Sequence, residues 1–223
     1  MNSLILQRFY DAYDLLLKNQ AETKYQGVNW TPHPMKELPT YNQHFNFDCY
    51  GMFFSWIFRH KLEYIKHDLL LLWNNEAKSK NYSTKYGDIL WLAYLMADNM
   101  QKQYLKQHVF PSWNDHYRKG NVNFMEQLSC TFRNININNE KIQPGDIIIW
   151  CNYFQNKPYQ KYGHIVIVLE HPKFISKEKC IIKCGETTNE GLKKGLQMKD
   201  RFFTQKGQSL FYRNKLAIIA RIF

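Results

Sequence analysis

The order in which helical and strand patterns appear constrains the fold of this 223-residue chain more than any other feature. From Met1 to about Gln107 the apolar residues mostly recur at helical spacing. From Asn134 onward, short runs of β-branched residues alternate with turn signals such as Pro144-Gly145. The sequence therefore predicts an α+β protein, in which N-terminal helices pack on a small antiparallel sheet.

The first half contains four candidate helices and one long loop. The residues from Met1 to Gln20 predict an amphipathic helix, and residues 22–47 form a loop rich in proline and asparagine. A helix buried against the core is expected from Cys49 to His60. Further helices are expected at Lys61 to Trp73 and at Gly87 to Tyr104.

The second half contains four candidate strands. A turn at Gln143 to Asp146 precedes the first of them. The strands are expected at Ile147 to Trp150, Gly163 to Leu169, Cys180 to Cys184 and Leu216 to Phe223. The interval from Thr187 to Arg213 combines glycines with many lysines, and its pattern predicts no element.

Composition narrows the class of protein. Hydrophobic residues make up 44% of the chain, which is enough to build a globular core, and a single domain is the simplest expectation for this length. The net charge of +11 favours anionic partners, but Lys and Arg are scattered, as on a solvated basic surface. No nucleic-acid-binding motif is present, so we expect no specific nucleic-acid partner.

The sequence shows no export signal or membrane span. No basic leader precedes an apolar run, and the densest apolar stretch, Leu69 to Trp73, is too short to cross a bilayer. We therefore expect a soluble protein made in the cytoplasm, with export by a dedicated machine left open. The five cysteines are an odd number and widely spaced, which favours reduced thiols.

Cys49 is the candidate nucleophile. It follows Asp48, a residue favoured at the start of a helix, and Gly51 beside it leaves room for a substrate. Unpaired backbone N–H groups in the first helical turn stabilise a thiolate and can also hold an oxyanion. The alternative is that Cys49 is a small buried hydrophobic residue, as most free cysteines are.

His164 is the candidate general base. It follows Gly163 and opens an apolar strand, where a polar side chain is unusual and suggests a specific role. Six of the other seven histidines lie in loops or beside polar helical stretches, as surface histidines do. The alternative is a structural histidine whose hydrogen bonds are satisfied at the strand end.

Three motifs, taken together, resemble the NlpC-type papain-like cysteine peptidases. Phe47-Asp48-Cys49-Tyr50-Gly51, Pro144-Gly145-Asp146 and Gly163-His164-Ile165-Val166-Ile167 correspond to the family's D-C-S-G-F, P-G-D-L and G-H-V-G-I motifs, in the same order. The last strand is also similar, so the resemblance covers roughly residues 45–223 through sparse anchors. It implies one papain-like domain over residues 1–223, with a helical extension (about 1–40) and an inserted helical region (about 61–135). It also implies that Cys49 is the nucleophile and His164 the base.

Departures from the family pattern concern the substrate cleft and the third catalytic residue. Tyr50 replaces the family's small residue and reshapes a cleft whose other walls should be Trp150 and the 152–162 loop. The strand from Cys180 to Glu186 lacks the His, Asn or Gln with which the family orients its histidine. We choose Glu186 for that role, with His171, a backbone carbonyl or a water molecule as alternatives.

These residues predict a cysteine hydrolase that cleaves amide bonds in peptides, isopeptides or peptidoglycan through a covalent thioester. No cofactor or metal is expected, because the spacing of His171, Cys180 and Cys184 fits no common zinc module. Acyl transfer to an acceptor other than water is one alternative, and an inactive binding module on the same fold is another. If the protein is a secreted effector or toxin, an inhibitor protein is the implied partner.

Overall fold

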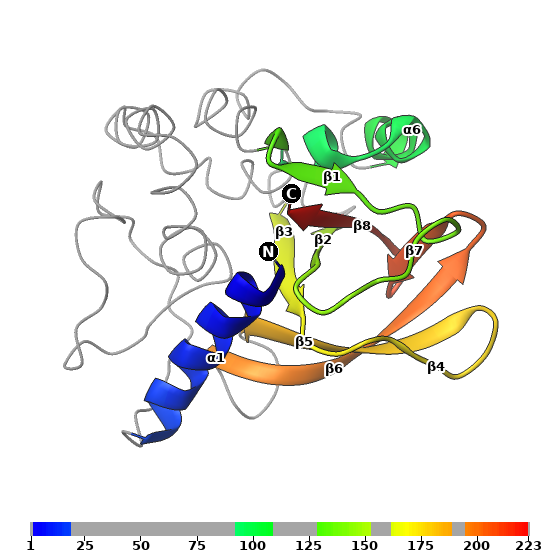
Figure 1. The fold of residues 1–223 in the computed structure, drawn as a ribbon. Coiled ribbons are helices and arrows are strands. Elements are labelled where there is room, and N and C mark those ends of the chain that lie inside the picture. The colour runs from blue at the N-terminus through cyan, green and yellow to red at the C-terminus, as the bar shows by residue number, and fades with distance from the viewer. Residues whose placement is uncertain (1, 19–91, 109–128, 153–161, 189–194, 223) are drawn as a thin grey trace, which may run out of the picture.

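The computed structural model describes residues 2–18, 92–108, 129–152, 162–188 and 195–222, and these form mostly a barrel of antiparallel strands (Figure 1). The helices are α1 (Asn2–Lys18) and α6 (Asn99–His108). The strands are β1 (Phe132–Asn134), β2 (Ile147–Asn152), β3 (Tyr162–Val168), β4 (Lys173–Phe174), β5 (Lys179–Thr188), β6 (Gly195–Lys206), β7 (Ser209–Tyr212) and β8 (Lys215–Ile222).

The barrel closes because its last two strands pair with each other. Hydrogen bonds join the strands in the order β8-β2-β3-β5-β6-β7, and β7 pairs again with β8. Every pairing is antiparallel, with β1 added to β8 and β4 added to β5. Arg213 and Asn214, both at positive φ, form the tight turn between β7 and β8. Closure leaves these six strands without a free edge between them.

The expected papain-like α+β fold, with helices packed on a small antiparallel sheet, is wrong. The described residues form mostly a β-barrel with few helices. The interval from Thr187 to Arg213, in which no element was predicted, contains all of β6 and β7. β6 and β7 close the sheet. The four expected strands therefore form most of a barrel instead of a small sheet.

Several local predictions are confirmed. The four expected strands correspond to β2, β3, β5 and β8, and the N-terminal helix corresponds to α1. The turn before β2 has Gly145 at φ 89°, which favours glycine, and the Asp146 amide donates to the Gln143 carbonyl at 3.1 Å. The expected helices over Cys49–His60 and Lys61–Trp73 lie outside the described residues.

The helix expected from Gly87 to Tyr104 is interrupted. Residues 92–96 are helical, and α6 then begins at Asn99. The Asp98 carboxylate accepts from the Gln101 amide at 2.8 Å, while the Gln101 side chain accepts from the Asp98 amide at 3.1 Å. This reciprocal capping box starts a new helix, and it is readable in the sequence as Asp followed three residues later by Gln.

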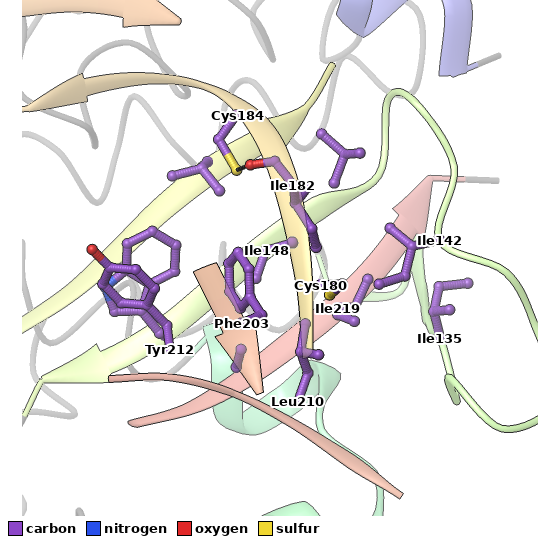
Figure 2. Close-up of a cluster of buried hydrophobic side chains, with 14 residues drawn as sticks. Ile135, Ile142, Ile148, Cys180, Ile182, Cys184, Phe203, Leu210, Tyr212 and Ile219 are labelled. Carbon is purple, nitrogen blue, oxygen red and sulfur yellow. Dashed lines mark hydrogen bonds between the residues drawn. The ribbon is translucent and has the colours of Figure 1, made fainter. Parts of the chain in front are cut away.

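Side chains from alternate positions of the six barrel strands fill the barrel (Figure 2). The cluster includes Ile148, Val166, Ile182, Cys184, Phe203, Leu210, Tyr212 and Ile219. Figure 2 shows Tyr212 on one side of this cluster and Ile135 and Ile142 on the other. On β2 and β3 the outward residues Ile147, Ile149, Ile165 and Ile167 are also fully buried. Both faces of these strands are covered, which explains their continuous apolar runs.

Asp146 of the Pro-Gly-Asp turn binds the last strand. Its carboxylate accepts two hydrogen bonds from the Arg221 guanidinium, at 2.7 and 2.8 Å, and one from the Gln143 amide at 2.8 Å. Arg221 also donates to the Lys141 carbonyl at 2.9 Å. Hydrogen bonding to Asp146, together with the charge of that carboxylate, raises the pKa of Arg221. Asp146 therefore has a structural role, joining the turn before β2 to β8.

Helix α1 packs on the outer face of β5 through an aromatic contact (Figure 1). Phe9 is fully buried, and its ring lies against Gly185. A Cβ atom added at Gly185 would stand 2.5 Å from the Phe9 ring. Glu186, the next residue along β5, points to the opposite face, into the barrel. The close approach of helix and strand therefore depends on a glycine at this position.

We expect Gly185→Ala to lower the free energy of unfolding by about 1–3 kcal/mol, because the new methyl group overpacks the contact with Phe9. Chemical denaturation followed by circular dichroism measures this loss. In a Phe9→Leu background the ring is absent, so the same substitution should cost much less. Equal costs in both backgrounds would show that the close contact does not determine the requirement for glycine.

Candidate active site

The candidate site lies inside the barrel, at the end where β2 finishes and β3 begins. His164 on β3 pairs in register with Trp150 on β2. The two rings lie 4.8 Å apart between centroids at an angle of 46°. Because Trp150 belongs to the buried cluster, it forms an apolar wall that limits where the imidazole of His164 can turn.

His164 contacts Glu186 of the neighbouring strand β5. The Nε2 atom of His164 lies 2.8 Å from Oε2 of Glu186, and the His164 side chain is 14% exposed while that of Glu186 is fully buried. An ionised carboxylate can only accept a hydrogen bond, so Nε2 must carry the proton. In the neutral ring Nδ1 is then the basic nitrogen, and it is the atom that can exchange a proton with a reacting group.

Glu186 has a second partner on β6, the strand that pairs with the other edge of β5. Arg201 on β6 donates from Nη2 to Oε1 of Glu186 at 2.5 Å and from Nη1 to the Tyr212 hydroxyl on β7 at 2.6 Å. The guanidinium also lies over the ring of Tyr212, 5.3 Å from its centroid, and 5.8 Å from that of Trp150. The four polar side chains thus form a continuous chain across the barrel, from His164 to Tyr212.

The charge state of Glu186 follows from these contacts. Burial raises the pKa of this carboxyl group. The hydrogen bond and charge of His164, together with the charge of Arg201, act in the opposite direction and outweigh burial, so the pKa of Glu186 is lowered. The carboxylate is therefore ionised at neutral pH and can fix the tautomer of His164.

The structure brings together two of the three residues chosen from the sequence. His164 and Glu186 are in contact, whereas Cys49 lies outside the described residues, as do Tyr50 and residues 153–161 of the expected cleft wall. The rival orienter His171 lies beyond the other end of β3, where its Nδ1 stands 3.4 Å from the Ile142 carbonyl oxygen. Geometry thus favours Glu186 over His171.

Arg201 and Tyr212 belong to the site but were not identified from the sequence. Both come from the interval between Thr187 and Arg213, in which the pattern predicted no strand. One signal was available. A Lys- and Arg-rich segment beside a strand that carries a candidate acidic residue can supply its counter-charge.

Two of the described cysteines, Cys180 and Cys184, are buried in the barrel. Cys184 is buried and donates to the Ile182 carbonyl at 3.5 Å, and burial raises the pKa of its thiol. Cys180 borders a cavity of about 710 Å³ at the opposite end of the barrel, and burial raises its pKa to about 11. Both thiols are protonated at neutral pH, unlike a nucleophile. Among the described side chains, no group of three His, Cys, Asp or Glu residues is placed to hold a metal ion.

No protein-family model, curated protein or solved structure matches this chain. The resemblance to NlpC-type peptidases therefore depends on the three short motifs alone, and one of them contains Asp146, whose role is structural. None of the helices in the described segments is long and apolar enough to cross a membrane. The chemistry of the site is therefore the basis for a functional assignment.

Proposed function

We propose that the protein is a cysteine hydrolase or acyltransferase in which Cys49 is the nucleophile, His164 the general base and Glu186 the residue that orients the imidazole. The observation that carries this proposal is the contact between His164 Nε2 and the buried carboxylate of Glu186 at 2.8 Å. A carboxylate so placed holds one ring nitrogen and directs the other toward a reacting group.

The reaction follows from these roles. The Cys49 thiolate attacks the carbonyl carbon of an amide or ester, and the Cys49 proton held on Nδ1 of His164 passes to the leaving group. A thioester with Cys49 results. His164 then takes a proton from water, or from another acceptor, as it attacks the thioester, and Cys49 is released. Glu186 stays ionised throughout and stabilises the imidazolium form of His164.

The substrate class we propose is a peptide, an isopeptide or a peptidoglycan-like amide. The formal charge of +11 supports an acidic substrate or partner, which a basic surface attracts over distances of several ångströms. If the protein acts as a toxin, we propose an acidic inhibitor protein as its partner, because its charge would complement this basic surface.

A test of the nucleophile uses the reactivity of its thiol. We expect iodoacetamide to alkylate Cys49 at about pH 6 at least an order of magnitude faster than an ordinary cysteine, because pairing with His164 favours the thiolate. His164→Ala should abolish that advantage. Peptide mapping by mass spectrometry measures the rate at each cysteine separately.

The chain contains its own controls for this measurement. Cys130 is exposed and serves as the reference thiol, while Cys180 and Cys184 are buried and should react slowly in the folded protein. The rate at Cys130 should be the same in the wild type and in His164→Ala. If Cys49 reacts no faster than Cys130 at about pH 6, the alternative of an inactive binding module is favoured.

A further inference from the structure

Arg201 occupies the centre of the polar chain that crosses the barrel. It bonds Glu186 with one nitrogen and the Tyr212 hydroxyl with the other, at 2.5 and 2.6 Å. The side chains of Arg201 and Glu186 are almost completely buried, at 3% and 0% exposed. This ion pair lies on the far side of Glu186 from His164, so Arg201 can act on the imidazole only through the carboxylate.

A buried carboxylate that had only a histidine as its partner would make a poor catalytic pair. The carboxylate would stay charged only while the imidazole was protonated, because a lone buried charge is costly. Such a histidine would hold its proton to high pH and could not act as a base near neutrality. Arginine removes this difficulty, since its guanidinium keeps its charge at every pH at which a protein folds.

We infer that Arg201 is a positioning residue for the His164–Glu186 pair. Its guanidinium, anchored on Tyr212, keeps Glu186 ionised in both protonation states of His164, so that the imidazole can take up and return a proton near neutral pH. The inference gives β6 and β7 a functional role besides closing the barrel, and it rests on the proposed function of His164 as a base.

Other charged and titratable groups near the pair are few among the described residues. Cys184 on β5 and Lys199 on β6 pair in register, on the same face as Glu186 and Arg201. The Cys184 thiol is neutral because burial raises its pKa. Lys199 is half-buried, and the guanidinium in contact with Glu186 is that of Arg201.

The test is an NMR titration of the ring nitrogens of His164 in the full chain, with Cys49→Ala to remove the thiol from the titration. In Arg201→Met the midpoint should rise by roughly one to two pH units, because a positive charge near the pair is lost. Arg201→Lys keeps the charge and should titrate close to the parent. If Arg201 had only a packing role, the midpoint of His164 would not differ in this way between the lysine and methionine variants.

A second variant guards against misfolding of Arg201→Met. Tyr212→Phe removes one hydroxyl group, keeps the buried ring and releases one anchor of the guanidinium. It should shift the midpoint in the same direction by a smaller amount. An unchanged midpoint in folded Arg201→Met would overturn the inference. If that variant does not fold, an unchanged midpoint in Tyr212→Phe overturns it, and a rise supports it.

The pH dependence of Cys49 alkylation in the same variants, with Cys49 restored, separates this inference from the proposed function. If both the His164 titration and the alkylation profile move, both proposals are supported. If the titration moves and the alkylation does not, the role of Arg201 is supported and that of Cys49 is overturned. If the titration does not move, the role of Arg201 is overturned, and the rate in His164→Ala decides on Cys49.

Discussion

Arg201→Met should lower the free energy of unfolding by about 3–5 kcal/mol, because it leaves the buried carboxylate of Glu186 with only the imidazole of His164 as a partner. Methionine is close to arginine in length and fills the same apolar surroundings beside Trp150 and Tyr212. The loss should therefore come from the charge and its hydrogen bonds, with little contribution from a cavity. Urea denaturation at neutral pH measures it.

A second Arg–Glu pair on the same barrel is a matched control. Arg133 bonds Glu140 through a short contact, but both side chains are about one-third exposed. Water already solvates these groups, so Arg133→Met should cost only a small fraction of the loss in Arg201→Met. Similar losses at the two positions would show that burial does not determine the effect.

The double variant Arg201→Met/Glu186→Gln tests the cause directly. It removes both charges, so no uncompensated ion remains in the barrel, and it should be more stable than Arg201→Met alone. If the two losses simply add, the ion pair is not the source of the destabilisation.

Acidification should reproduce part of this effect in the wild type. The pKa of Glu186 in the folded protein is below its ordinary value of 4.5, so its contribution is complete above that pH and is lost as the pH falls further. The difference in unfolding free energy between wild type and Glu186→Gln should therefore narrow below about pH 4.5.

The sequence predicts the strands whose apolar residues run continuously or alternate, and it fails in β6, where the pattern is inverted. In β2 and β3 the continuous isoleucine and valine runs indicate buried strands, as observed. In β6 the inward residue Arg201 is 3% exposed, while its outward neighbour Phe202 is 64% exposed. A charged residue inside and an aromatic residue outside cancel the alternation that marks a strand. The fold class was wrong for that reason.

The sequence predicted those residues of the candidate site whose type is needed for the proposed chemistry. A histidine that opens an apolar strand and an acidic residue on the next strand indicated His164 and Glu186, and the structure places them in contact. The Arg201 partner of Glu186 was not predictable, because the pattern predicted no strand between Thr187 and Arg213, where β6 pairs with β5. Without that strand, nothing in the sequence indicates that Arg201 faces Glu186.

Cys49→Ala and His164→Ala should each lower the rate of the reaction by at least about a thousandfold, because nucleophile and base act as one unit. A panel of peptidoglycan fragments, isopeptides and acyl esters, analysed by mass spectrometry, identifies the substrate with the wild type and measures the loss. Adding hydroxylamine tests for the thioester, because hydroxylamine attacks this intermediate and yields a hydroxamate. The product formed without hydroxylamine, a free acid or an acylated acceptor, distinguishes hydrolysis from acyl transfer.

The double variant Cys49→Ala/His164→Ala is the decisive control for this unit. If the two residues cooperate, removing the second costs almost nothing once the first is absent, so the double variant should be as slow as either single variant. Additive losses would indicate that Cys49 and His164 contribute independently.

Glu186→Gln should have a smaller effect, because an amide still holds the imidazole but no longer stabilises its charge. Full activity in Cys49→Ala would overturn the cysteine mechanism and leave the His164–Glu186 pair as a base without a protein nucleophile.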